Sequence, residues 1–162
     1  MRRGMRRILG VTALTLVLAM VLPLSVARAD TTRSWQVLPN ATNFRLWHCL
    51  WYYSTLKVNT DVAACAYRQP GSNLAQGAIV VRNRSNAVRY AQTWDLGLNA
   101  ASDGRRLSQY QTACPSLPVA PGAMVVCWGQ TVSTGLIPHE DALSSGYAAV
   151  SGATGYFWSL TA

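Results

Sequence analysis

A base, two acids and a hydroxyl lie close together near the end of the sequence. His139, Glu140 and Asp141 are consecutive, and Ser144 follows three residues later. Hydrolases use such groups for nucleophilic catalysis. Closeness in sequence is not triad geometry, however, and Pro138 before the cluster is more typical of a polar loop or of the turn that begins a helix. The chain also lacks the His-Glu-x-x-His and Gly-x-Ser-x-Gly motifs. The sequence therefore favours a protein that is not an enzyme.

The four cysteines could supply thiolate, metal or disulfide chemistry. His48 could activate the neighbouring Cys49 as a nucleophile, but the close Cys-x-x-Cys pairs of structural zinc sites are absent. An even number of cysteines in an exported chain is typical of disulfides, and four cysteines allow three pairings. We expect Cys49 to pair with Cys65 and Cys114 with Cys127, because each pair closes a short loop. Each bridge would contribute roughly 3 kcal/mol, and we expect no metal and no cofactor.

Aromatic side chains are the stronger indication of function. The densest group is Trp47, Trp51, Tyr52 and Tyr53. In a strand Trp47, Trp51 and Tyr53 would share one face with Cys49, while Tyr52 would point to the other. Sugar-binding proteins use such rings as stacking platforms, but the same rings could instead fill the core of a small domain. Three further tryptophans continue apolar patterns and are expected in the core: Trp94, Trp128 and Trp158.

The first residues have the organisation of an export signal. Residues 1–7 contain four arginines, residues 8–26 are almost wholly apolar, and Ala27-Arg28-Ala29 has the small-x-small pattern of a cleavage site. An apolar run of this length could also cross a bilayer, but Pro23 and Ser25 interrupt its end. We therefore predict a cleaved signal peptide over residues 1–29 and a secreted, extracellular domain over residues 30–162. No stable membrane insertion is expected after cleavage.

Removal of the predicted signal peptide changes the charge of the chain. Five of the 14 Lys and Arg residues would leave with it, so nine would remain against six Asp and Glu, a net charge of +3 rather than +8. A nucleic-acid partner would be indicated by a denser basic patch, so none is expected. Arg82, Arg84 and Arg89 form the most notable basic cluster. They could line an anionic-ligand site or simply face water.

The elements that must position these residues are strands. No segment has helical periodicity over a dozen residues, although a helix over residues 44–53 stays possible beside the strand that its aromatics favour. Residues 78–82 and 88–94 predict a hairpin around a turn at 83–86. The remaining predicted elements are a turn at 102–104, a strand over 107–112, a proline-rich loop over 115–122, and strands over 123–128, 147–150 and 156–160.

Short strands at regular spacing are the pattern of a β-sandwich. The sequence shows no internal repeat and no linker. We therefore predict an all-β protein, a single antiparallel immunoglobulin-like β-sandwich stapled by two disulfides, and we expect a monomer.

The specific form of this sandwich is indicated by a resemblance. It rests on residues 80–88, Cys114-Pro115, Leu117, Ala120-Pro121-Gly122, Cys127 and Thr131-Val132. These segments resemble the immunoglobulin-like β-sandwich domains of secreted and surface proteins from actinobacteria. The resemblance covers residues 78–150. It implies a fold but lends no catalytic residues, because most such domains are of uncharacterised function.

Together these patterns predict a secreted, non-catalytic binding or interaction domain that acts at or outside the cell envelope. The expected partner is a cell-envelope polysaccharide or an extracellular protein. One alternative is a carbohydrate-binding module that uses Trp and Tyr stacking. Others are a protease inhibitor, whose proline-rich loop over residues 112–122 would be preorganised for docking, and a small secreted hydrolase.

Overall fold

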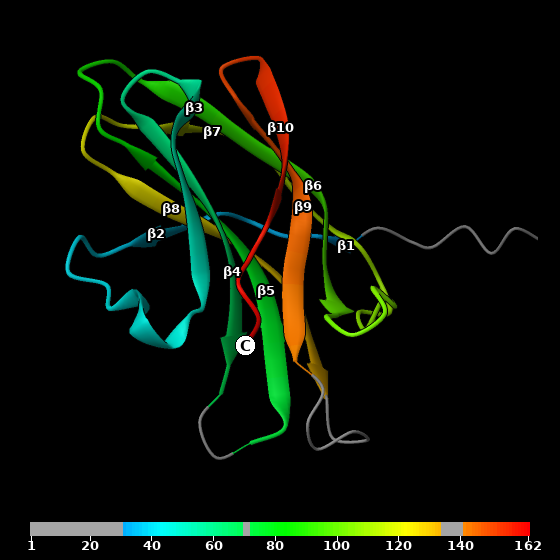
Figure 1. Cartoon of the computed structure of the whole chain (residues 1–162). Coiled ribbons are helices and arrows are strands. Elements are labelled where there is room, and N and C mark those ends of the chain that lie inside the picture. The colour runs from blue at the N-terminus through cyan, green and yellow to red at the C-terminus, as the bar shows by residue number, and fades with distance from the viewer. Residues whose placement is uncertain (1–30, 70–71, 134–140) are drawn as a thin grey trace, which may run out of the picture.

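The chain folds into two β-sheets that pack face to face (Figure 1). The computed structural model describes residues 31–69, 72–133 and 141–162. The predicted signal peptide, Asp30, His139 and Glu140 lie outside these residues. Sheet A contains, in spatial order, β1 (Thr31–Thr32), β7 (Thr112–Val119), β6 (Arg89–Ala100), β9 (Ala142–Val150) and β10 (Ala153–Trp158). Sheet B contains β2 (Gln36–Leu38), β8 (Met124–Ser133), β5 (Leu74–Asn83), β4 (Thr60–Arg68) and β3 (Cys49–Lys57).

The prediction of an all-β protein is confirmed. The one helical element among the described residues is the short 3-10 helix η1 (Phe44–Leu46). Neighbouring strands are antiparallel except β1 and β7, which pair in parallel. The segment over residues 44–53 is thus divided between η1 and the beginning of β3, and its aromatics belong to both.

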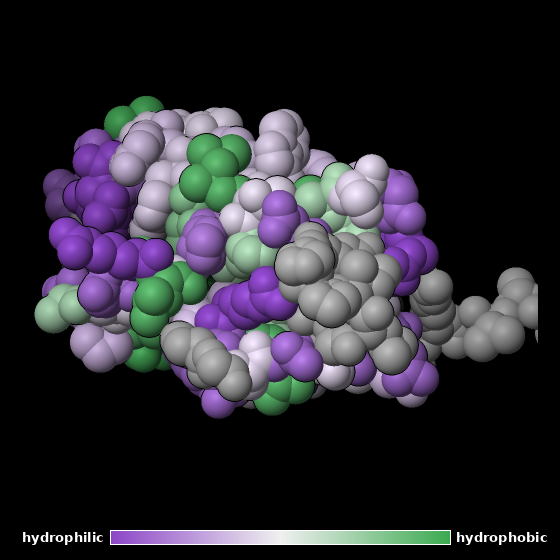
Figure 2. Space-filling model, turned by 60° about the horizontal axis from the view of Figure 1, so that its bottom comes forward, coloured by the Kyte–Doolittle hydropathy of each residue, from purple (hydrophilic) through white to green (hydrophobic). Residues whose placement is uncertain are grey.

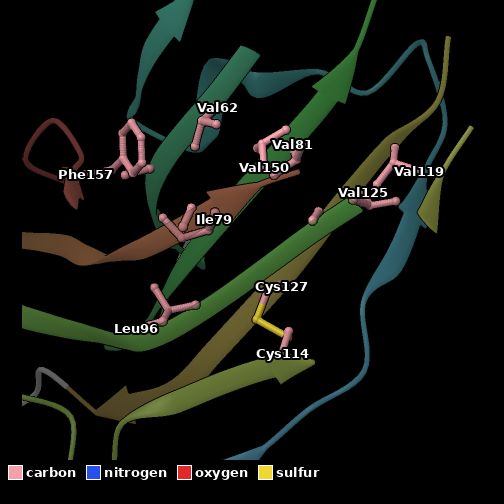
Figure 3. Packing of buried hydrophobic residues seen from close by; sticks show 13 residues of the cluster. Val62, Ile79, Val81, Leu96, Cys114, Val119, Val125, Cys127, Val150 and Phe157 are labelled. Atoms are coloured by element: carbon pink, nitrogen blue, oxygen red, sulfur yellow. A yellow bond between two sulfur atoms is a disulfide. The ribbon is translucent and has the colours of Figure 1, made fainter. Parts of the chain in front are cut away.

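The main hydrophobic core lies between the sheets (Figure 3). Val62 and Ile79 from sheet B face Leu96 and Val150 from sheet A, and Phe157 of β10 closes one side. All five are at most 2 % exposed. Burial of such side chains contributes about 1.5–3 kcal/mol each, so this layer is the main source of stability.

The disulfides have the predicted connectivity. Cys114 and Cys127 join β7 to β8 and thereby tie sheet A to sheet B within the core. Cys49 and Cys65 lie directly opposite each other on β3 and β4. Because Cys49 is disulfide-bonded, it cannot provide the nucleophilic thiolate considered beside His48.

A second apolar layer covers the outer face of sheet B. Ala63, Val80 and Val126 are fully buried there, on the side of the sheet away from the main core. Phe44 and Trp47, from the segment between β2 and β3, pack over them. In Figure 1 this segment is drawn in cyan at the lower left, beside β3. Sheet B is therefore apolar on both faces, and its central strands do not show the alternation of a half-exposed strand.

The predicted hairpin over residues 78–94 is wrong. β5 belongs to sheet B and β6 to sheet A, so the turn between them crosses from one sheet to the other. The buried side chain of Asn83 stabilises this crossing. Its amide N–H₂ donates to the carbonyl oxygens of Ala87 at 2.8 Å and Val119 at 2.9 Å, and its amide oxygen accepts from the backbone N–H of Ser85 at 3.0 Å. A turn of this composition can join strands within a sheet or between sheets, and packing decides which.

The prediction of a loop over residues 115–122 is also wrong, because β7 continues to Val119 through Pro115 and Pro118. Beyond Ala113, β7 pairs with β6 only, since β1 accompanies it at Thr112 and Ala113 alone. Proline is tolerated on such an edge, because its missing N–H is not needed by a second neighbour. The strand expected over residues 107–112 begins only at Thr112.

Candidate functional site

A groove of about 420 Å³ is hollowed into the outer face of sheet B. We call it the sheet B groove. The side chains discussed below as its lining are Trp51 and Tyr53 of β3, Arg82 at the end of β5, and Arg84 after it. The other residues that line it are Asn40, Thr42, Phe44, Asn83, Gly122 and Met124.

Two nearly parallel aromatic rings form one wall of this groove. The ring planes of Trp51 and Tyr53 differ by 16°, with centroids 6.3 Å apart. They lie two residues apart on β3 and therefore share a face. Tyr53 is 62 % exposed, whereas Trp51 is half-buried against Phe44 and carries the guanidinium of Arg82 over its ring at 4.9 Å. The wall thus presents an accessible ring beside a ring that is held in place.

The two arginines of the groove are held by one buried carboxylate. Arg84 binds Asp61 through two nitrogens, both at 2.7 Å, and Arg82 binds Asp61 Oδ2 through Nε at 3.1 Å and Nη2 at 2.7 Å. The Asp61 side chain is fully buried, while those of Arg82 and Arg84 are 37 % and 44 % exposed. One negative charge therefore orders two positive charges that remain accessible from the groove.

These contacts determine the ionisation of Asp61. Burial by itself raises the pKa of the carboxyl, but the hydrogen bonds and charges of Arg84 and Arg82 outweigh burial and hold its pKa below the ordinary value. The same pairing raises the pKa of Arg84. Asp61, Arg82 and Arg84 consequently stay charged at neutral pH, and together they present a net charge of +1 toward the groove.

A bulge in β3 links these three charged side chains to the exposed ring of Tyr53. The register of β3 and β4 shifts between Tyr52 and Lys57, and Ser54 within the bulge has a φ of 53°. Its backbone N–H donates to Asp61 Oδ1 at 3.3 Å. A bulge of this kind redirects side chains locally, so Asp61 helps to fix the backbone immediately after Tyr53.

The four aromatic residues predicted as a binding strip do not all reach this groove. Trp47 lies on the same outer face, but it packs among Phe44, Trp128 and Tyr67. Tyr52 points to the main core, where it contacts Phe157 and donates its hydroxyl to the carbonyl oxygen of Trp158 at 3.0 Å. Burial raises the pKa of Tyr52, so this hydroxyl remains a donor. The face alternation predicted for β3 is observed, and it leaves Trp51 and Tyr53 at the groove.

The three tryptophans expected in the core lie elsewhere. Trp158 is 51 % exposed. Trp94 lies on the outer face of sheet A, since its neighbour Thr93 points inward and is buried. Trp128 is half-buried in the outer layer of sheet B. The alternating pattern identified one face of each strand correctly, but it could not tell which of the two faces is the inner one.

Of the four residues considered for catalysis, the structure describes Ser144 and Asp141. Ser144 is fully buried, with no hydrogen-bond partner for its hydroxyl among the described residues, and Asp141 is exposed. His139 and Glu140 lie outside the described residues. A buried hydroxyl cannot reach a substrate, so Ser144 does not serve as the nucleophile considered there.

The basic cluster expected from the sequence is divided by the fold. Arg82 and Arg84 meet at the groove, while Arg89 begins β6 in the other sheet. The sequence indicated the arginines but not their contact with Asp61, which lies directly opposite Arg82 across β4 and β5. A single acid at the start of an alanine- and valine-rich strand is the signal that could have identified it.

A second hollow, of about 460 Å³, lies beside Trp128 and is lined also by Arg33, Ser34, Gln36 and Gln76. The indole N–H of Trp128 donates to Gln36 at 3.2 Å, and the amide of Gln76 donates to the carbonyl oxygen of Gly129 at 2.8 Å. Gln36, Gln76 and Trp128 thus already have partners within the protein, and the hollow contains one guanidinium group, that of Arg33. The sheet B groove, with an exposed ring and two accessible guanidinium groups, is therefore the better candidate site.

Comparisons of the chain with protein-family models, with curated proteins and with solved structures found no match. Within residues 31–69, 72–133 and 141–162, no three His, Cys, Asp or Glu side chains gather as a metal site would require. The same residues contain no helix of the length and apolarity needed to span a membrane. The geometry of the groove must therefore carry the functional argument.

Proposed function

We propose that this chain is a secreted, non-catalytic binding domain that acts at or outside the cell envelope, and that its sheet B groove binds an acidic polysaccharide. We also propose that its two-layered fold is of the immunoglobulin-like type. The observation that carries the binding proposal is the exposed ring of Tyr53, stacked beside Trp51 at the edge of a groove that contains two guanidinium groups.

The rings support a sugar ligand. A sugar ring has an apolar face of C–H groups and a rim of hydroxyls, so it matches an aromatic face flanked by polar groups. Tyr53 is 62 % exposed, and the groove also contains the polar side chains of Asn40 and Thr42. Ligand pockets typically combine apolar walls with a few polar groups that orient the ligand.

The arginines support an acidic ligand. Guanidinium groups bind carboxylates and phosphates through paired hydrogen bonds. Asp61 neutralises only one of the two positive charges, and it lies buried beneath the groove. Among the described residues that line the groove there is no carboxylate to repel an anion. A polymer with uronic acid or phosphate groups therefore complements the groove better than a neutral one.

Two features support secretion. Residues 1–29 have the pattern of a cleaved signal peptide. The two disulfides, Cys49–Cys65 and Cys114–Cys127, are typical of proteins that fold in an oxidising compartment. Residues 30–162 would then be the working domain.

The proposal is tested by affinity electrophoresis of the oxidised protein in gels that contain polygalacturonate, alginate or a phosphate-bearing cell-wall polymer, with neutral dextran as the reference. We expect retardation in at least one acidic gel, weaker at high salt because screening reduces the guanidinium contribution. Tyr53→Ala should weaken the retardation, because its Kd should be about tenfold higher, which corresponds to about 1.4 kcal/mol of binding free energy.

The matched control is Tyr90→Ala, which removes a 56 % exposed tyrosine from the other sheet and should migrate as the unaltered protein does. Mobility in every acidic gel equal to that in a gel without polysaccharide would contradict the proposal. So would retention of Tyr53→Ala equal to that of the unaltered protein.

A further inference from the structure

The outer face of sheet A has an aromatic row of its own. Trp94 on β6 pairs across the strands with Tyr147 on β9, which in turn pairs with Tyr156 on β10. One sequence neighbour of each residue has a buried side chain, namely Thr93, Ala148 and Phe157, so these three side chains point outward. We call this row the sheet A platform. It lies on the opposite side of the molecule from the sheet B groove, because the main core separates the two sheets.

The rings of the platform pack against one another across the three strands. The planes of Trp94 and Tyr147 are parallel within 1°, with centroids 5.6 Å apart. Tyr156 meets Tyr147 at 60° with centroids 4.9 Å apart. Tyr147 is 39 % exposed and Tyr156 46 % exposed. Cross-strand aromatic pairs stabilise a sheet, and rings that remain this accessible also offer apolar area that a ligand could cover.

Polar groups flank the rings. Gln92 is exposed two residues before Trp94 on the same face, and Asn99 follows the bulge in β6, where its amide donates to Ser145 at 2.7 Å. Amides can donate to and accept from sugar hydroxyls. An apolar strip bordered by such groups matches the two kinds of surface on a sugar chain.

A bulge fixes the edge of the platform. The register of β6 and β9 shifts between Trp94 and Gly97, and Asp95 within the bulge has a φ of 58°. Asp95 accepts a hydrogen bond from Arg106 at 3.3 Å, and the Arg106 guanidinium lies over Gly97. The charges of Arg106 and Asp95 cancel each other, whereas in the groove two arginines share the single negative charge of Asp61. The platform therefore offers no excess positive charge to an anion.

We propose that the sheet A platform is a second ligand site and that it binds a neutral polysaccharide chain. The exposed parts of Tyr147 and Tyr156 would contact the apolar faces of sugar rings, while Gln92 and Asn99 would bind hydroxyls. This proposal uses none of the residues of the sheet B groove and does not depend on its function. If both sites are occupied, the protein joins an acidic and a neutral polymer through opposite faces.

The test is partition of the purified, oxidised protein onto insoluble cellulose, chitin and β-1,3-glucan. We expect binding to at least one of them that persists at high salt, because no charge attraction is involved. Tyr147→Ala and Trp94→Ala should each weaken the partition by about tenfold, and Tyr147→Phe should retain it, because the ring is kept. Urea midpoints of the variants show whether a loss of binding reflects a loss of folding.

The matched control is Tyr53→Ala, which should bind neutral polymers as the unaltered protein does even if the groove proposal fails. Absence of binding to all three polymers would overturn the platform proposal. It would also be overturned if folded Tyr147→Ala bound normally, or if Tyr53→Ala lost binding to the same extent. A dimer in sedimentation that disappears in Tyr147→Ala would show that a second copy, not a sugar, covers this face.

Discussion

The substitution Asp61→Asn tests the central electrostatic argument, because it removes one negative charge and almost no volume. Asp61 is fully buried and accepts five hydrogen bonds, four of them from Arg82 and Arg84 and one from the backbone of Ser54. The substituted amide would retain one oxygen as an acceptor and would place an N–H₂ group against a guanidinium donor.

The magnitude follows from the burial of the partners. Removing one partner of a buried ion pair costs about 3–5 kcal/mol. The arginines here are 37 % and 44 % exposed, so water can solvate them in the variant and the cost falls to the lower end. We therefore expect a loss of about 3 kcal/mol in the free energy of unfolding. With an m value of about 2 kcal/mol/M, the urea midpoint would fall by about 1.5 M.

The pH dependence provides a second measurement. Because the pKa of Asp61 is lowered in the folded protein, its contribution is fully present above the pKa of the unfolded chain and is lost as the pH falls through the folded value. The difference between the unaltered protein and Asp61→Asn should therefore be constant from about pH 5 to pH 8 and should shrink below about pH 4.

The matched control is Asp103→Asn. The Asp103 carboxylate is 57 % exposed and lies 3.7 Å from Arg105, a surface pair whose loss costs less than about 1 kcal/mol. The reasoning would be refuted if Asp61→Asn changed the free energy of unfolding by less than 1 kcal/mol, or if its effect grew as the pH fell below about 4.

Two further substitutions test the core and the disulfides. Replacing both Cys114 and Cys127 by Ala should cost about 3 kcal/mol, because the bridge closes a short loop with a sequence separation of 13. Calorimetry of the oxidised variant checks this, and a variant as stable as the unaltered protein would contradict it. Phe157→Ala should cost about 3–5 kcal/mol in urea unfolding, because Phe157 is 2 % exposed and packs against Tyr52. A cost close to that of the exposed Tyr90→Ala would show that this end of the core can collapse around the cavity.

Local pattern was sufficient to predict several parts of the molecule. Strands such as Met124–Ser133 contain uninterrupted β-branched or apolar runs, which indicate extended structure wherever they pack. The pairing of Cys49 with Cys65 is also a local matter, because the two residues lie on strands joined by a tight turn. β4 itself was missed, since its alanine-rich sequence has little strand preference of its own and is extended because it pairs on both sides.

The sequence by itself thus determined the all-β class and that Trp51 and Tyr53 lie on the side of β3 opposite to Tyr52, and it favoured the observed disulfide pairing among three, because strand alternation and short loop closure act over a few residues. Only the tertiary structure decided that β5 and β6 lie in different sheets and that Trp94 faces outward. It also decided that Arg82 and Arg84 share one buried acid. These features depend on which faces are covered and on contacts between residues distant in the chain, and alternation is identical for an inner and an outer face.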